Sequence, residues 1–268
     1  MEDLWQAFKD RYSGQGLPID AFWEDGIFNE DAYRQARPKI LFVLKEVNSQ
    51  EQKDLRKFLK GGPRYPIWHA VARWAAGLTY GFPAYSEIGE KARAAFCGVA
   101  AVNLKKTGGS GSANMAEIAA YAYIARDLIV RQIEEIRPDV IVACGVFDIL
   151  KWLFEFPINP TDPDRPVRET QGRFWVVPFR HPGRANMYGE RYYSELKERV
   201  ERVPELVSLL YGQQAKADAD GQRLNFFNDL ETPPEEELSK VPTQRDLFSG
   251  LAELKEEKAE EETKKEED

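Results

Sequence analysis

The sequence predicts an α/β domain, a three-layer α/β/α sandwich around a central, mostly parallel sheet of four strands. Four apolar runs rich in β-branched residues alternate with long segments of helical periodicity, which is the pattern of a sheet covered by helices. With 268 residues and 43% hydrophobic content, the chain can bury one substantial core.

The four predicted strands follow one another along the chain with long intervals between them. KILFVL (residues 39–44) is a central strand because it is apolar throughout and follows Pro38. The others are FCGVAAVNL (96–104), PDVIVACG (138–145), which Gly145 closes, and RFWVVPF (173–179).

Three helices are predicted between and after these strands. Asn114 and Glu117 form a capping box that opens a helix over residues 115–136. Residues 146–154 form a short helix, and residues 190–211 form a last one, broken near Pro204. The buried face of the first helix is predicted to comprise Ile118, Tyr121, Ala122, Ala125, Leu128, Ile129 and Ile133.

The charge is unevenly distributed and divides the chain at residue 212. Residues 213–268 hold 17 acidic and 8 basic side chains, whereas residues 1–212 hold 28 acidic and 29 basic ones. The net charge of −8 therefore belongs to the tail. We predict a globular domain over residues 1–212 that can carry a local basic cleft, and a disordered acidic tail over residues 213–268.

Composition excludes several classes of protein. No run of 18 apolar residues exists, and the N-terminus is acidic rather than basic and then apolar, so we expect a soluble, cytoplasmic protein without a membrane partner. Cys97 and Cys144 lie in apolar runs, which predicts reduced core residues. Two cysteines are too few to hold an iron–sulfur cluster that needs four. We expect a monomer that uses no metal or other cofactor.

Polar or glycine-rich segments follow each predicted strand. They are KEVNSQE (45–51), NLKKTGGSGSAN (103–114), Gly145 and RHPGRAN (180–186). Ligands of parallel α/β sheets bind at the carboxyl ends of the strands, so these segments form a candidate site. The glycine-rich segment lacks the Gly-Lys-Ser/Thr ending and the dinucleotide spacing, which argues against an NTPase or NAD enzyme.

The ordered set LKEVNS, AAVNLKKTGGSG, RPDVIVACG and RHPGRAN resembles the four strand-end motifs of the uracil-DNA glycosylase superfamily, over residues 38–199. The resemblance implies a metal-free, monofunctional glycosylase. Such an enzyme hydrolyses the bond between sugar and base after the base has been flipped out of single- or double-stranded DNA.

The resemblance also implies residue roles. His181 matches the histidine that donates to the base carbonyl, Asn103 the asparagine that reads the base edge, and Glu46 an acidic residue that acts on water or on the sugar cation. Val47 stands where several branches carry a catalytic Asp or Asn. Asn48, one residue later, is the substitute if the loop is shifted.

Other residues complete the expected site. Trp68 is a candidate to stack on the flipped base, with core packing as the alternative. Asn103 and Glu46 also have alternatives, as a turn former and as a solvated carboxylate. The expected contacts to DNA phosphates come from the glycine-rich segment and the last motif: Lys105, Lys106, Gly108, Gly109, Ser110, Arg180 and Arg184.

Two other functions stay open at this stage. Val47 favours a catalytically silent protein of the same fold that binds nucleic acid or nucleotides as a sensor. A hydrolase of modified nucleosides or nucleotides is the third candidate function.

In the tail, QRDLF (244–248) resembles the peptide by which bacterial repair proteins bind the sliding clamp, with Gln244, Leu247 and Phe248 as anchors.

Overall fold

A computed structural model describes residues 2–220 except residues 52, 110–112, 158, 184–186 and 188, and all described residues lie in one compact unit. The strands are β1 (Trp23–Glu24), β2 (Gly26–Ile27), β3 (Ile40–Leu44), β4 (Lys53–Asp54), β5 (Val99–Asn103), β6 (Val140–Cys144), β7 (Val167–Arg168) and β8 (Trp175–Phe179). The helices are α1 (Glu2–Gly14), α2 (Glu30–Gln35), α3 (Leu55–Leu59), α4 (Pro66–Tyr80), α5 (Gly89–Cys97), α6 (Met115–Ile124), α7 (Arg126–Ile136), α8 (Phe147–Phe154), α9 (Glu190–Glu201) and α10 (Pro204–Asp220), with a 3₁₀ turn at Tyr85–Glu87.

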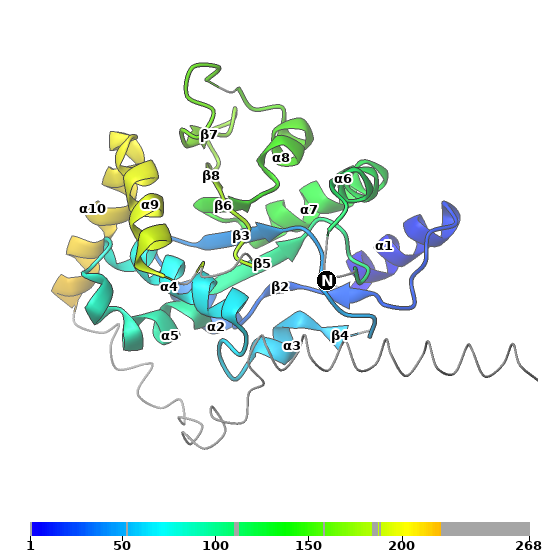
Figure 1. Cartoon of the computed structure of the whole chain (residues 1–268), viewed down its shortest axis with the longest axis horizontal. Coiled ribbons are helices and arrows are strands. Elements are labelled where there is room, and N and C mark those ends of the chain that lie inside the picture. Colours follow the sequence, from blue (N-terminus) through cyan, green and yellow to red (C-terminus); the bar gives the residue numbers. More distant parts are fainter. Residues whose placement is uncertain are drawn as a thin grey trace, which may run out of the picture. The chain divides into compact units, whose positions relative to one another are not determined.

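The central sheet is mostly parallel and has the strand order β2-β5-β3-β6-β8-β7 (Figure 1). Its four inner strands, β5, β3, β6 and β8, pair in parallel and match the four predicted strands. The prediction of a four-stranded sheet is wrong, because β2 and β7 add an antiparallel pair at each edge. Each of these edge strands has two residues, which is too short for an alternating pattern to be visible in the sequence.

Successive residues of each inner strand serve two different cores. In β3, Ile40, Phe42 and Leu44 pack with α4, α5, α9 and α10, whereas Leu41 and Val43 pack with α1, α6, α7 and α8. Side chains alternate across a strand, so a strand covered on both faces is apolar at every position. Helices therefore lie on both faces of the sheet (Figure 1).

The helix predicted over residues 115–136 is two helices, α6 and α7, that meet at Ala125. Arg11 of α1 donates to the carbonyl of Ile124 at 2.8 Å and to the carboxylate of Asp127, so the carbonyl freed at the break is satisfied from a distant part of the chain. The predicted buried face is confirmed, because all seven of its residues are buried.

The last helices agree with the predicted break near Pro204, which separates α9 from α10. Helix α10 extends past residue 212 to Asp220. Within the described part of the chain, no helix is long and apolar enough to cross a membrane.

Candidate functional site

The four predicted strand-end segments meet at one edge of the sheet. Strands β5, β3, β6 and β8 are neighbours and run in parallel, so their carboxyl ends share that edge. The side chains that gather there, together with Gly145, are called the strand-end site: Lys45, Glu46, Lys105, Gly145 and His181. The chain runs from β3 to β5 on one side of β3 and then from β5 to β6 on its other side, so the strand order reverses between β3 and β6. Open α/β sheets bind ligands at such a switch point.

Glu46 and Lys105 form the charged part of the strand-end site. The Lys105 ammonium lies 2.7 Å from a Glu46 oxygen and 2.7 Å from a Glu117 oxygen. The Lys105 and Glu46 side chains are only 5% and 6% exposed, whereas Glu117 is 44% exposed. Burial alone would lower the pKa of Lys105, but the hydrogen bonds and charges of Glu117 and Glu46 outweigh it and raise that pKa.

The predicted capping box of Asn114 and Glu117 is only half formed. The Asn114 side chain accepts from the amides of Ala116 and Glu117, at 3.1 and 3.4 Å. The Glu117 carboxylate binds Lys105. Helix α6 is thus tied to the end of β5 by its first turn.

Gly108 and Gly109 of the second segment do not form a phosphate cradle. The amide of Gly108 donates to the carbonyl of Ala21 and that of Gly109 to the carbonyl of Val47, both at 2.8 Å, so neither amide is left for a ligand. A Cβ at Gly108 would collide with the carbonyl of Ser49, and one at Gly109 with the Glu46 carboxylate. These glycines are needed because the loop after β3 lies directly against them.

His181 lies at the end of β8, beside Gly145. The backbone amide of Gly183 donates to its Nδ1 atom at 3.2 Å, which places the ring proton of neutral His181 on Nε2. The Nε2 atom itself is buried. Gly145 has a φ of +70°, and a Cβ there would lie 3.4 Å from both the Cβ of His181 and the Cε of Lys45.

Asn103 and Lys106 belong to a buried network rather than to the strand-end site. Lys106 and Asp25 are 0% exposed and form an ion pair at 2.8 Å, and Gln132 bonds to both of them. Asn103 donates to Asp25 through its backbone amide at 2.8 Å and its side-chain amide at 3.3 Å. The predicted roles of Asn103 on a base edge and of Lys106 on a phosphate are therefore corrected, because both groups are buried and bound to Asp25.

Burial lowers the pKa of Lys106, although the charge and hydrogen bond of Asp25 oppose that shift. The same ammonium lies 5.7 Å from the ring centre of Trp5 and 5.3 Å from that of Phe8. The surroundings of Lys106 are those of a core residue.

The remaining predicted residues differ in their surroundings. Trp68 is 6% exposed and packs on Phe28 and Phe96, at 5.8 and 6.2 Å between ring centres, so the alternative of core packing describes it. Arg180 donates to both oxygens of Glu195, at 2.9 and 3.1 Å. Asn48 is exposed in the loop after β3. Ser110, Arg184, Gln244, Leu247 and Phe248 lie outside the described residues.

Sequence reasoning missed three residues around this edge. Asp25 and Gln132 bind Lys106 from 81 and 26 residues away, and nothing in their own segments indicates a buried partner. Lys45 opens the segment KEVNSQE, and no role was predicted for it. A basic residue directly after a central strand was the signal available.

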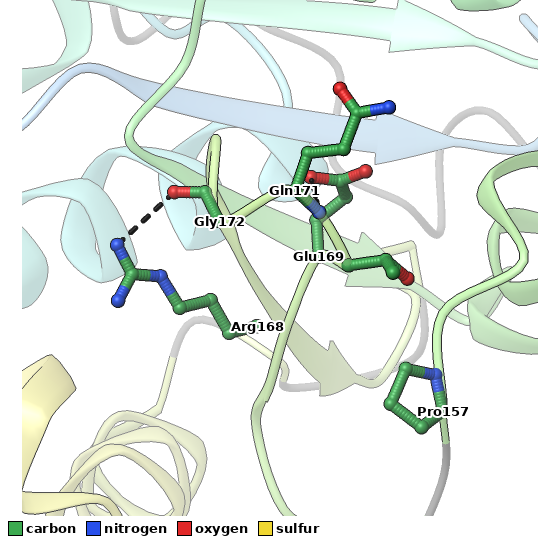
Figure 2. A pocket seen from close by; sticks show the side chains of 6 residues that line it. Pro157, Arg168, Glu169, Gln171 and Gly172 are labelled. Atoms are coloured by element: carbon green, nitrogen blue, oxygen red, sulfur yellow. Dashed lines mark hydrogen bonds between the residues drawn. The ribbon is translucent and has the colours of Figure 1, made fainter.

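A cavity of about 650 Å³ lies elsewhere, at the turn between β7 and β8 (Figure 2). The polar groups around it bind one another: Arg168 donates to the carbonyl of Gly172 at 3.1 Å, and Glu169 accepts from the amide of Gln171 at 2.9 Å. This turn precedes β8, whereas the strand-end site follows it, so the cavity is not part of that site.

No protein-family model matches the chain, and no curated protein matches it.

Proposed function

We propose that the protein hydrolyses the N-glycosidic bond of a uracil or another altered base that has been flipped out of DNA. One observation supports the proposal above others. The four segments that carry the resemblance end four neighbouring parallel strands, in the order β5-β3-β6-β8, and so reach one edge of the sheet. The helices on both faces of that sheet support the three-layer arrangement that the resemblance implies.

His181 has the chemistry needed on the leaving base. Hydrolysis replaces the bond between the sugar C1′ and the base nitrogen with a bond between C1′ and a water oxygen. The base takes the bonding electrons. One proton of the water stays on the new C1′ hydroxyl group, and the other goes to the base nitrogen. With Nδ1 accepting from Gly183, neutral His181 donates through Nε2 to the base carbonyl as negative charge develops there. Because Nε2 is buried, the base must displace whatever covers it.

Glu46 has the chemistry needed on the sugar. A carboxylate at the end of β3 stabilises positive charge on the sugar and orients water by hydrogen bonding. Its pair with Lys105 fixes the position of the carboxylate before the substrate arrives. Asn48, exposed in the following loop, is the second group that we assign to the water.

The test is incubation of the purified protein with single- and double-stranded oligonucleotides that carry uracil or hypoxanthine, followed by alkaline cleavage of abasic sites. We expect abasic product from the unaltered protein and a loss of roughly 100-fold in rate in Glu46→Gln. The matched control is Glu51→Gln, since Glu51 is exposed, follows the same strand and pairs with Lys53. Equal rates in the two variants would contradict the role of Glu46.

A second function, a sensor that binds nucleic acid or nucleotides without cleaving them, is favoured by one observation. The Glu46 carboxylate is 6% exposed and bound to Lys105, so little of it is open to water or to a sugar. A sensor would bind the same oligonucleotides and give no abasic product with any base, whereas the glycosylase would give product. The excision assay and a binding titration together separate the two functions.

The tail peptide at residues 244–248 supports a second proposed partner, a bacterial sliding clamp. Leu247 and Phe248 are apolar anchors in an acidic segment, as in short peptides that bind a hydrophobic groove. Replacing both by Ala should abolish binding to a purified clamp in a surface-immobilised assay. Unchanged binding, or none from the unaltered protein, would exclude the proposal.

A further inference from the structure

Lys45 differs from the other basic residues near the strand-end site. Lys105 binds Glu46 and Glu117, Lys106 binds Asp25, and Arg180 binds Glu195. Lys45 is partly buried, and its ammonium has no ion pair or hydrogen bond with any residue in the described part of the chain. Its positive charge is therefore available to a ligand.

The position of Lys45 is central to the sheet. Its backbone carbonyl accepts from the amide of Lys105 at 3.0 Å, which continues the pairing of β3 with β5 beyond their last residues. Its side chain turns the other way, over Gly145 at the end of β6. A Cβ atom built on Gly145 would lie 3.4 Å from both the Lys45 Cε and the His181 Cβ. Lys45 thus spans the switch point between β3 and β6.

The backbone at Gly145 favours the same kind of ligand. Gly145 lacks a side chain and leads directly into α8, whose N-cap, Val146, makes no side-chain capping bond. The first amides of a helix attract anions, and here they follow the glycine that Lys45 covers. Asp148 in the first turn is exposed, and it is the acidic group of this helix start.

We propose that Lys45, over Gly145 and beside His181, forms a subsite for one phosphate group of a nucleotide. A lysine ammonium is a common phosphate ligand that acts as a point charge. This inference rests on the proposed function, since it assigns to Lys45 the phosphate contact that the sequence had assigned to Lys106, and it places that contact next to the histidine that meets the base.

The test measures binding and does not depend on catalysis. Fluorescein-labelled pentathymidylate is titrated with the full chain and followed by anisotropy, with thymidine 5′-monophosphate, thymidine and inorganic phosphate as competitors. We expect Lys45→Met and Lys45→Gln to weaken binding about tenfold and to reduce its salt dependence by about one phosphate contact. Lys45→Arg should retain most of the affinity, and Lys60→Met, which removes an exposed lysine at the end of α3, should change nothing.

The competitors identify the source of the phosphate. Competition by the monophosphate but not by thymidine supports a phosphate subsite. Inorganic phosphate should compete weakly, because it occupies the same subsite without the rest of the nucleotide. Unchanged affinity in both Lys45→Met and Lys45→Gln, or equal competition by thymidine and its monophosphate, would overturn the inference. So would the absence of binding by both the pentathymidylate and the monophosphate.

Failure of the inference and failure of the proposed function give different results. Binding that depends on Lys45 without abasic product from any base would remove the glycosylase and keep the subsite. Abasic product formed at equal rates by Lys45→Met and the unaltered protein, with equal affinity, would remove the subsite and keep the glycosylase. Urea unfolding of each variant shows whether it is folded.

Discussion

Lys105 and Lys106 are neighbours in the sequence, and the structure puts them in opposite environments. Lys105 binds two carboxylates at the edge of the sheet, one of them nearly half exposed. Lys106 is fully buried and binds Asp25, Gln132 and the faces of two aromatic rings. The pKa of Lys105 is raised by its carboxylates, and that of Lys106 is lowered by burial.

The ammonium groups of Lys105 and Lys106 differ in how easily a ligand can reach them. A ligand would have to break the core to reach Lys106, whereas the Lys105 group needs only a change of partners at the surface end of α6. A buried ion pair is costly to break because the remaining charge has no water. Lys105 keeps one partly exposed partner, Glu117, when a ligand displaces it from Glu46. The buried network around Asp25 therefore holds the end of β5 in place, and the Lys105 pair belongs to the strand-end site.

The largest expected effect comes from Asp25. Asp25→Ala leaves the Lys106 ammonium buried without its carboxylate, and we expect it to lower the free energy of unfolding by about 3–5 kcal/mol. Urea denaturation followed by tryptophan fluorescence measures the change. The double variant Asp25→Ala/Lys106→Met should recover part of the loss. A loss below about 1 kcal/mol in the single variant would mean that the network is not a buried pair.

Gly109→Ala should have the next largest effect. The added methyl group collides with the Glu46 carboxylate, so either the loop after β3 moves or Glu46 leaves Lys105. We expect a loss of about 1–3 kcal/mol in the free energy of unfolding, which is typical of overpacking. Gly89→Ala is the control, since a Cβ there meets nothing within 4 Å. Equal stability of the two variants would show that the loop is not packed on Gly109.

The sequence predicts the inner sheet better than the buried network, and the reason is physical. Strands β3, β5, β6 and β8 are covered on both faces, which makes them apolar at every position except Asn103 and easy to find. The fate of Lys106 and Asn103 depends on Asp25, which lies between two strands of two residues each and about 80 residues earlier. No local pattern connects such partners. The edge position of Glu46 and His181 follows from strand order, but the pairing of Glu46 with Lys105 does not.

Lys105→Met should cost less than Asp25→Ala, about 1–3 kcal/mol. It leaves the 6% exposed Glu46 carboxylate without its partner, but water replaces the lysine at the partly exposed Glu117. The pH dependence is specific. A raised pKa in the folded state gives stability that is present below the ordinary lysine pKa of 10.5 and is lost as pH rises through the raised value. The difference between the unaltered protein and Lys105→Met should thus be constant below pH 10 and shrink above 10.5.

The smallest expected effect is that of Gly145→Ala. Its φ of +70° is costly for alanine, while the added Cβ would make only ordinary contacts at 3.4 Å with Lys45 and His181. We expect a loss of about 1 kcal/mol in the free energy of unfolding, which thermal unfolding detects. A loss as large as that of Asp25→Ala would mean that Lys45 and His181 are packed more tightly over Gly145 than these contacts indicate.

The central claim is that the strand-end site breaks a glycosidic bond with His181 on the leaving base. The chain has two histidines, so the most direct measurement compares His181→Ala with His69→Ala in the rate of abasic-site formation from a uracil-containing oligonucleotide. His69 lies in α4, within the chain's core-forming elements and outside the strand-end site. We predict a rate lower by about 100-fold or more in His181→Ala and an unchanged rate in His69→Ala. Equal rates in the two variants, with both folded, would contradict the account.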